Sequence, residues 1–479
     1  MKRGYRYSIN GRALSRRAFI GGASASLVAC ATPRQSWSKT TADVIVIGAG
    51  LAGLHATWQL EQAGLKVMLL EGNNRTGGRL YTLDNLPGTP DAGGVQVGAA
   101  YKRFNTIADR LGVERYLPES GRGGYLYNVR GQNFQKDEWP SLPQNMLGDG
   151  EKKTTPDALF FSYLRKLPGL EMTADWMSPE ITAEDISLAS WLKAQGASDE
   201  AMRFMNANLN GRTLEEMSML HMQRTLSMFT TARNANPGPT KFIRGGSQRM
   251  TDAMTSALNS DIILNAPVSA IVDKGDGVEV SLVDGRKFGA RQVICTAPFS
   301  TVKNMKIEAP LPPVLRNTIQ QLPYTKASFV FLRATDAFWK EDGLPEYIWS
   351  DDPLLGRVFT LNSSPPLLKV WINGPAAEVL DNMNPQQAAA EMITRIEKVR
   401  PSAKGKLSYL SMFSWQKEPF ARGIYHHIGS GLGAALAKTV QYQGQRLHFA
   451  GEHMTQNWPG MEGALETAER AANRVLALA

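Results

Sequence analysis

The chain has 479 residues, more than one compact core usually organises, so we expect two domains or one large composite fold. Its composition, 43% hydrophobic and 20% charged, is ordinary for a soluble globular protein and argues against a fibrous, disordered or membrane-spanning chain. Of the 53 basic residues, eight lie in residues 1–40, where no acidic residue occurs, and the other 45 nearly balance the 44 acidic residues. The net charge of +9 therefore does not indicate a surface for nucleic acid.

We expect residues 1–31 to be an export signal and residues 32–40 to be the linker that follows it. Arg16 and Arg17 stand directly before a short run rich in Gly, Ala and Ser. This pattern is typical of twin-arginine signals, and it suits a protein that is exported already folded around its cofactor. The run is too short to cross a bilayer, which needs about 20 apolar residues. We expect a periplasmic protein that uses the twin-arginine export machinery and has no transmembrane span.

Two ways of processing the signal stay open. Leu27–Cys30 resembles a lipobox, in which Cys30 would carry a lipid anchor. Ala29-Cys30-Ala31 equally fits a small-x-small cleavage site, and we favour this soluble form. After cleavage, Cys295 is the one internal thiol, which excludes an intrachain disulfide.

A strand-helix-strand unit opens the body of the chain. Val44–Ile47 is a wholly apolar, β-branched run, as in a parallel strand that is buried on both faces. A helix is expected from about Leu51 to Ala63, and a second strand over Lys66–Leu70.

The remaining elements follow from changes in periodicity along the chain. Helical periodicity prevails between about Phe104 and Phe229, where most methionines and aromatic residues are interpreted as helix core. Strands are expected over 262–296, with hairpin turns at 275–277 and 284–285. Further expected elements are strands near 327–332, 368–372 and 447–450 and helices near 386–399 and 462–478.

A glycine-rich turn between the first strand and helix predicts a dinucleotide site. Gly48 permits the tight turn, Gly50 lets a pyrophosphate approach the backbone, and Gly53 lets the helix pack closely on the strand. Ala52 lies in the same turn, at a helix N-terminus that attracts phosphates. Glu71 ends the second strand about twenty residues on, where its carboxylate can accept hydrogen bonds from ribose hydroxyls.

Further motifs resemble those of a flavoprotein family, and this resemblance implies that the dinucleotide is FAD and not NAD. Arg75-Thr76-Gly77-Gly78-Arg79 resembles the second glycine motif of the flavin-containing amine oxidases, the superfamily of monoamine oxidases and L-amino acid oxidases. Other matches follow in the family's order along the chain, up to Phe449–Glu452 and Gly460–Ala464. The resemblance covers nearly all of residues 42–479. It implies bound FAD, with the following additional contacts: Arg79, Gly94, Val95, Val268, Trp415, Glu452 and Met461.

The same resemblance implies an α/β fold in which a Rossmann-type FAD-binding domain is interleaved with a substrate domain of mixed β-sheet and helices. The FAD-binding domain would combine residues 41–98, 237–300 and 420–479. The substrate domain would combine residues 99–236 and 301–419.

Three residues are candidates for catalysis. Lys326 falls where amine oxidases carry a lysine that holds a water against flavin N5, although a lysine on this strand could also face solvent. Tyr425 resembles one wall of the family's aromatic cage, which orients the amine nitrogen. Gly460 stands where the family has the second cage tyrosine, so Trp458 either replaces that wall or serves in packing.

Two departures from the family's sequence pattern bear on how FAD is attached and on the class of substrate. Ile424 stands where monoamine oxidases have a cysteine joined to the flavin, so non-covalent FAD is expected. Val97 stands where L-amino acid oxidases are taken to have a carboxylate-binding arginine, so an amine without an α-carboxylate is expected. An arginine from the helical insert could still substitute for it. The six histidines have no metal-ligand spacing, and no metal is expected.

The resemblance implies an amine oxidase that moves hydride from the amine α-carbon to flavin N5. The imine would hydrolyse to an aldehyde or ketone, and O2 would be reduced to hydrogen peroxide. The alternatives are an L-amino acid oxidase, a dehydrogenase or desaturase-like flavoprotein with another electron acceptor, and a non-enzymatic carrier. A homodimer also stays open, because the sequence does not give the oligomeric state.

Overall fold

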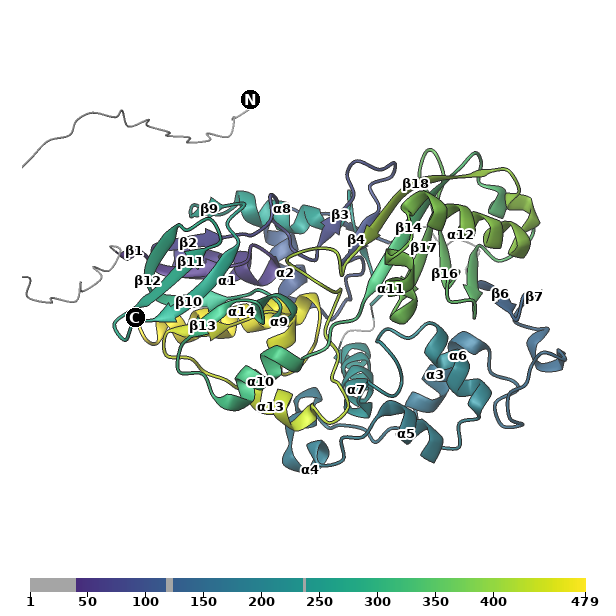
Figure 1. Ribbon diagram of the computed structural model, residues 1–479, viewed down its shortest axis with the longest axis horizontal. Coiled ribbons are helices and arrows are strands. Elements are labelled where there is room, and N and C mark those ends of the chain that lie inside the picture. Colours follow the sequence, from purple (N-terminus) through teal and green to yellow (C-terminus); the bar gives the residue numbers. More distant parts are fainter. Residues whose placement is uncertain (1–39, 118–123, 236–237) are drawn as a thin grey trace, which may run out of the picture. The chain divides into compact units, whose positions relative to one another are not determined.

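The structure, a computed structural model, describes residues 40–117, 124–235 and 238–479 (Figure 1). The expected export signal lies outside the described residues, as does the linker apart from its last residue. Within the described part of the chain, no helix is long and apolar enough to span a membrane.

The first large sheet is built from strands that lie far apart in the sequence. In the part of the chain that the structure describes, it has eight strands in the order β13-β10-β11-β12-β1-β2-β9, with β19 also paired to β12. Its strands are β1 (Thr40–Ile47), β2 (Val67–Leu70), β9 (Asp261–Ile263), β10 (Val268–Asp273), β11 (Val278–Leu282), β12 (Lys287–Cys295), β13 (Lys306–Glu308) and β19 (Leu447–Phe449). Strand β1 runs parallel to both β2 and β12. The turns of the antiparallel β10-β11-β12 meander fall at the expected positions.

Strand β1 is apolar because it is covered on both faces. Ile45 and Ile47 belong to one hydrophobic cluster, while Val44 and Val46 belong to another. A side-chain period of two sends neighbouring residues to opposite faces of a sheet. The β-branched run thus fills two cores at once.

The second large sheet is formed mainly by strands from the second half of the chain. Within the described residues it has seven strands in the order β18-β14-β17-β16-β15-β6-β7. They are β6 (Tyr125–Val129), β7 (Gln132–Phe134), β14 (Ala327–Ala334), β15 (Tyr347–Ser350), β16 (Arg357–Leu361), β17 (Leu367–Asn373) and β18 (Leu407–Ser414). Two short pairs complete the strands: β3 (Tyr81–Thr82) with β4 (Asp91–Gly93), and β5 (Arg115–Tyr116) with β8 (Phe242–Ile243).

Helices cover both sheets and form a separate group between β7 and β8. In Figure 1, α1 and α14 accompany the first sheet, α12 lies beside β14 and β17, and α3, α5, α6 and α7 gather in the remaining part. The α-helices are α1 (Leu51–Gln62), α2 (Lys102–Arg110), α3 (Pro156–Leu164), α4 (Pro179–Thr182), α5 (Leu188–Ala194), α6 (Asp199–Ala207), α7 (Met219–Ala235), α8 (Gln248–Ser256), α9 (Phe299–Val302), α10 (Pro313–Gln321), α11 (Pro375–Asp381), α12 (Pro385–Val399), α13 (Gly433–Val440) and α14 (Met461–Leu476). Short 3-10 turns include η2 (Thr173–Met177) and η5 (Glu452–Met454).

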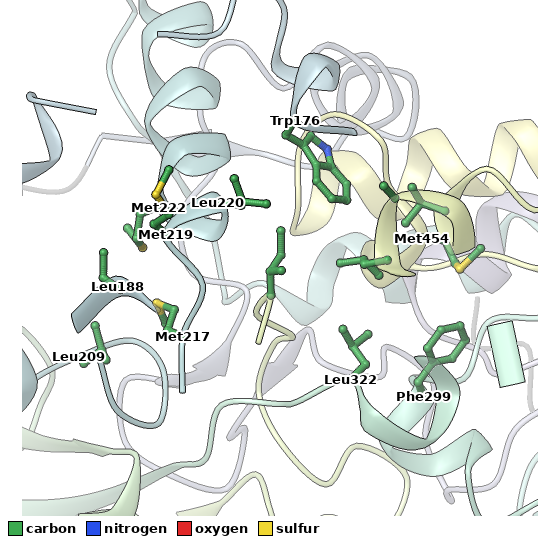
Figure 2. Close-up of a cluster of buried hydrophobic side chains, with 14 of the residues drawn as sticks. Trp176, Leu188, Leu209, Met217, Met219, Leu220, Met222, Phe299, Leu322 and Met454 are labelled. Carbon is green, nitrogen blue, oxygen red and sulfur yellow. The ribbon is translucent and has the colours of Figure 1, made fainter. Parts of the chain in front are cut away.

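The methionine-rich stretch around the start of α7 packs into the core. Figure 2 shows Met217, Met219 and Met222 gathered near Leu188. The indole of Trp176 lies on the side of Met454 and donates a hydrogen bond to the Gln456 carbonyl (2.9 Å). Trp176 therefore connects the helical group with the segment that precedes α14.

The expected α/β architecture with interleaved segments is confirmed. Some short strands were not predicted, and β6, β7 and β13 depart from the regions assigned from the sequence. Strands β6 and β7 lie inside the stretch with helical periodicity, and β13 joins the first sheet although residues 301–419 were assigned to the substrate domain. All three strands are short, and their few residues give little periodic signal.

The contact between α1 and the turn after β1 generates a stability prediction. A Cβ atom on Gly53 would lie only 1.8 Å from the carbonyl oxygen of Gly48. Gly53→Ala is therefore expected to lower the free energy of unfolding by about 1–3 kcal/mol or more, because helix and turn must move apart. Urea denaturation measures this change.

Gly169→Ala is the matched control, because no atom lies within 4 Å of an added Cβ there. This variant should change the free energy of unfolding by less than about 0.5 kcal/mol. Equal stability of the two variants would contradict the assigned role of Gly53.

Candidate active site

A single cavity of about 1670 Å³ borders both large sheets. Its walls include residues at the ends of β1, β2 and β10 on one side and residues of β16 and β17 on the other. Pockets for one small ligand usually measure about 300–1000 Å³. This cavity therefore has room for a dinucleotide and a substrate together.

The first part of the cavity, here called the dinucleotide end, surrounds the glycine turn. Gly48, Gly50 and Ala52 line it, and Gly48 has a φ of 99°, a conformation that favours glycine. Gly53 does not line the cavity, because it packs against the turn. Val268 lines the same end where β10 begins.

Glu71 is buried at this end and connects two backbone turns. Its carboxylate accepts hydrogen bonds from the N–H groups of Ala49 (2.6 Å) and Asn73 (2.8 Å). Burial raises the pKa of Glu71 in spite of these hydrogen bonds. Its position at the cavity wall leaves it able to accept a further hydrogen bond from a ribose hydroxyl.

Arg79 and Glu452 form a buried ion pair in the wall. Their side chains approach to 2.8 Å, and Arg79 also donates to the Ile424 carbonyl (3.0 Å). Burial alone would raise the pKa of Glu452, but the charges of His426 and Arg79 outweigh it and hold the pKa well below its usual range. The positive charge of Arg79 is thus shared with a carboxylate and is not free for phosphates alone.

Two helices open their N-termini onto the cavity. Neither α1 nor α14 has a side chain that caps its first N–H groups, and Leu51 and Met461 line the cavity at these two ends. Uncapped helix N-termini bind anions and electron-rich atoms through free N–H groups and the helix dipole. This arrangement fits a flavin dinucleotide, with phosphates at α1 and the pyrimidine edge at α14.

The strand pair β3-β4 and Trp415 form the next stretch of wall. Gly94, Val95 and Trp415 line the cavity, and the Trp415 indole donates a hydrogen bond to the Ala92 carbonyl (2.8 Å). A Cβ on Gly93 would lie 2.8 Å from the Trp415 ring. The indole is therefore fixed directly behind the loop that precedes Val95.

The second part of the cavity, here called the aromatic chamber, lies against the second sheet. Its rings touch one another in sequence: Tyr125 and Tyr347 (6.2 Å between centroids), Tyr347 and Phe359 (5.4 Å), and Phe359 and Trp371 (6.1 Å). Tyr425 also lines the cavity, and burial raises the pKa of its hydroxyl to about 12. The chamber is thus rich in aromatic rings. Tyr425, whose backbone carbonyl accepts a hydrogen bond from the Thr325 N–H (2.8 Å), stays protonated at neutral pH.

Lys326 does not line the cavity, which corrects the expected position of the active-site lysine. It immediately precedes β14, and its ammonium pairs with Glu378 at the start of α11. Phe329 and Phe331 of β14 face the cluster around Trp415, whereas Val330 and Leu332 face α12. Lys326 and Val330 are four residues apart, so their side chains point to the same face of the strand. Because Val330 faces α12, the side chain of Lys326 points away from the cavity.

Lys369 of β17 is the lysine that lines the cavity. Its ammonium donates a hydrogen bond to the Asp91 carbonyl (2.8 Å) and lies 4.1 Å from the centre of the Phe329 ring. Burial lowers the pKa of Lys369 to about 8, although the nearby Asp91 carboxylate opposes this shift. The sequence holds one signal for it, a lysine at the centre of the apolar strand Leu367–Asn373.

Trp458 does not line the cavity either, and its place at the wall is taken by Tyr101. The two rings lie 6.3 Å apart, with Tyr101 on the side of the cavity. The Tyr101 hydroxyl is 3.9 Å from the point where a Cβ on Gly460 would be. The missing side chain of Gly460 is therefore partly replaced by a residue from the start of α2, and Trp458 supports it from behind.

Position 97 carries no information on the substrate. Val97 is buried in the hydrophobic core beside β1, and its backbone pairs with Lys241. Gln96 is the neighbouring side chain that lines the cavity. Alternate residues of an extended segment face opposite sides, so a residue at position 97 points away from any bound ligand.

Two further groups were considered as ligands. Among the described residues, no cluster of His, Cys, Asp and Glu has the arrangement of a metal site. Cys295 is buried at the end of β12 with its pKa raised to about 12, and it does not line the cavity.

Comparisons with known proteins agree with this geometry. The chain matches the family described as flavin containing amine oxidoreductase over residues 51–476. It is 25% identical to amine oxidase [flavin-containing] A of Sus scrofa over 456 residues, which cover 91% of this chain and 85% of the relative. It is also 24% identical to an L-amino-acid oxidase of Siganus canaliculatus, with 91% and 86% of the two chains covered.

The fold is similar to that of cyclohexylamine oxidase from Brevibacterium oxydans IH-35A. The TM-score is 0.77 at 22% identity, with 91% of this chain and 99% of the other covered. The chain thus belongs to the flavin-containing amine oxidoreductases, and its cofactor is FAD.

Proposed function

We propose that this protein oxidises an amine and uses O2 as the electron acceptor. The observation that carries the proposal is the continuity of one cavity from the dinucleotide end, through the wall at Trp415 and Lys369, into the aromatic chamber. A redox cofactor and an organic substrate can meet only where two such sites join. The names of the relatives, an amine oxidase and a cyclohexylamine oxidase, support an amine as the substrate.

The side chains of the chamber would bind and orient the amine. Aromatic faces of Tyr425 and Tyr101 attract an amino group and restrict its orientation, and the surrounding rings exclude water. An amine must be neutral before its α-hydrogen leaves as hydride. Lys369 lies in the wall of the cavity, and its pKa is lowered to about 8. Its Nζ can therefore accept the proton that the substrate's ammonium group must lose.

FAD, when bound, would supply the redox chemistry: it would accept hydride from the amine α-carbon, which leaves an imine, and its two electrons would reduce O2 to hydrogen peroxide. The imine then hydrolyses to an aldehyde or ketone and ammonia or an amine. Non-covalent binding is supported by Ile424, which lines the cavity where a linking thiol would have to stand.

The proposal is tested on the purified protein. We expect a flavin absorption spectrum, anaerobic bleaching by at least one of benzylamine, putrescine and a set of L-amino acids, and stoichiometric hydrogen peroxide when air is admitted. A colourless protein that takes up no FAD would refute it. Bleaching without peroxide would instead favour a dehydrogenase that uses another acceptor.

Glu71 generates a prediction on cofactor affinity. Glu71→Gln keeps the shape of the side chain but removes the charge that would accept the ribose hydrogen bonds. Hydrogen bonds to charged groups contribute about 1.5–3 kcal/mol, so the dissociation constant of FAD should rise about ten-fold or more. Titration of the apoprotein with FAD, followed by flavin fluorescence, measures this constant.

Glu215→Gln is the control, because this carboxylate is exposed and lies outside the cavity. Its affinity for FAD should equal that of the wild type. The role of Glu71 would be wrong if both variants bound FAD as tightly as the parent.

Lys369 generates a prediction on pH dependence. Below pH 8 its Nζ is protonated and cannot accept a proton, whereas above pH 8 it can. The rate of anaerobic flavin bleaching by an amine should therefore rise more steeply between pH 7 and pH 9 in the wild type than in Lys369→Met. Stopped-flow measurements compare the two proteins with the same amine. The ionisation of the substrate then affects both rates equally, so a difference in the profiles comes from the protein. Profiles of identical shape would exclude Lys369 as the proton acceptor.

We further propose export to the periplasm through the twin-arginine route, on the strength of the sequence around Arg16 and Arg17. The double variant Arg16→Lys, Arg17→Lys should remain in the cytoplasm of a host that has this route. Arg12→Lys, outside the pair, should be exported normally. Cell fractionation with immunodetection measures both, and mass spectrometry of the exported N-terminus shows whether Cys30 is lipidated or removed.

A further inference from the structure

Arg357, the first residue of β16, places a guanidinium in the aromatic chamber. It lines the cavity, and its Cζ atom lies 5.0 Å from the centre of the Trp371 ring. One hydrogen bond holds it, from Nη2 to the side-chain oxygen of Asn210 (3.2 Å). Asn210 lines the same chamber, so both residues present polar groups to a ligand there.

Among the described residues, no carboxylate forms an ion pair with this guanidinium. Its Nε is shut off from solvent without a hydrogen-bond partner. Other internal arginines of this chain are neutralised or held by several groups: Arg79 pairs with Glu452, and Arg400 pairs with Asp342. Arg357 is only partly exposed and lies against the Trp371 ring, so the lack of such a partner costs free energy.

Lys369 is the second cation of the chamber, and the nearby Asp91 carboxylate balances its charge only in part. Lys369 donates to the Asp91 backbone carbonyl, while one Asp91 carboxylate oxygen accepts hydrogen bonds from Thr82 (2.7 Å) and Ser247 (2.9 Å). Two positive side chains thus face a chamber whose other lining groups are mainly aromatic. Such a chamber attracts an anionic group and repels a second ammonium group, as in a diamine.

We infer that Arg357 and Asn210 form a carboxylate-binding site, and that the amine substrate carries a carboxylate together with an apolar or aromatic frame. A carboxylate matches the planar fork of a guanidinium through two parallel hydrogen bonds. This assignment rests on the proposed amine oxidation and narrows it to amino acids. It replaces the expectation drawn from Val97, whose side chain lies in the core.

Binding of non-oxidisable acids and their amides tests the site without catalysis. The probes are 3-phenylpropanoate with 3-phenylpropanamide, and hexanoate with hexanamide, titrated into the FAD-loaded protein by calorimetry. At least one acid is expected to bind about 10- to 100-fold more tightly than its amide, since charged hydrogen bonds are lost in the amide. Equal binding, or no binding of either acid, overturns the inference even if no variant can be prepared.

Arg357→Met is expected to remove the preference for the acid while it leaves the affinity for the amide within a few-fold of the wild type. Arg333→Met is the matched control, an exposed arginine on β14 of the same sheet, and should keep the full preference. Arg357→Lys keeps the charge without the fork and should retain part of the preference. A preference that survives in Arg357→Met assigns the carboxylate to another group and overturns the inference.

Flavin bleaching separates this inference from the proposed function. If phenylalanine and 2-phenylethylamine bleach the flavin with equal kcat/KM, amine oxidation stands and the carboxylate site fails. If no amine or amino acid bleaches the flavin but the acid preference depends on Arg357, the binding site stands and the proposed reaction fails.

Discussion

The buried ion pair between Arg79 and Glu452 connects the segments on which the cavity depends. Arg79 is the last residue of the second glycine motif, and Glu452 stands in the turn before α14, 373 residues further along the chain. The carbonyl of Ile424 and the imidazole of His426 join the same network. Loss of either charge would leave the other without its partner in a largely buried position, so this network holds three stretches of the chain in one wall. Both the dinucleotide end and the aromatic chamber border this wall.

The two ends of the cavity differ in the way they favour negative charge. At the dinucleotide end, free N–H groups of α1 and α14 act as partial charges that are part of the backbone. In the aromatic chamber, full charges stand on Arg357 and Lys369, held between rings. Backbone dipoles suit a cofactor that stays bound, because they need no deprotonation and no side-chain rearrangement. Side-chain charges suit a ligand that enters and leaves.

Much of the fold was predictable because its signals are local. The β-branched run of β1, the glycine turn and Glu71 lie within 32 residues and define a strand-helix-strand unit by themselves. The elements assigned to 386–399 and 462–478 agree with α12 and α14 within a few residues. Short strands such as β6, β7, β15 and β16 escaped prediction, since only their partners in the sheet define them.

The site was predictable where a backbone conformation is required and less so where a side chain must point in one direction. Gly48, Glu71 and Trp415 line the cavity as their motifs suggest. Lys326 and Val97 do not, because a shift of one residue along an extended segment sends a side chain to the other face. Lys369 and Arg357 lie on the paired antiparallel strands β17 and β16, and because β16 was not predicted, their proximity was not foreseen.

The burial of Cys295 has a practical consequence for experiments on this protein. Its thiol is enclosed at the end of β12 and is rarely ionised at neutral pH, so maleimides and other thiol reagents will not reach it in the native state. In a version of the chain that begins after Cys30, a cysteine introduced on the surface would be the single reactive sulfur. A fluorophore or spin label could then report on the walls of the chamber without background from native residues.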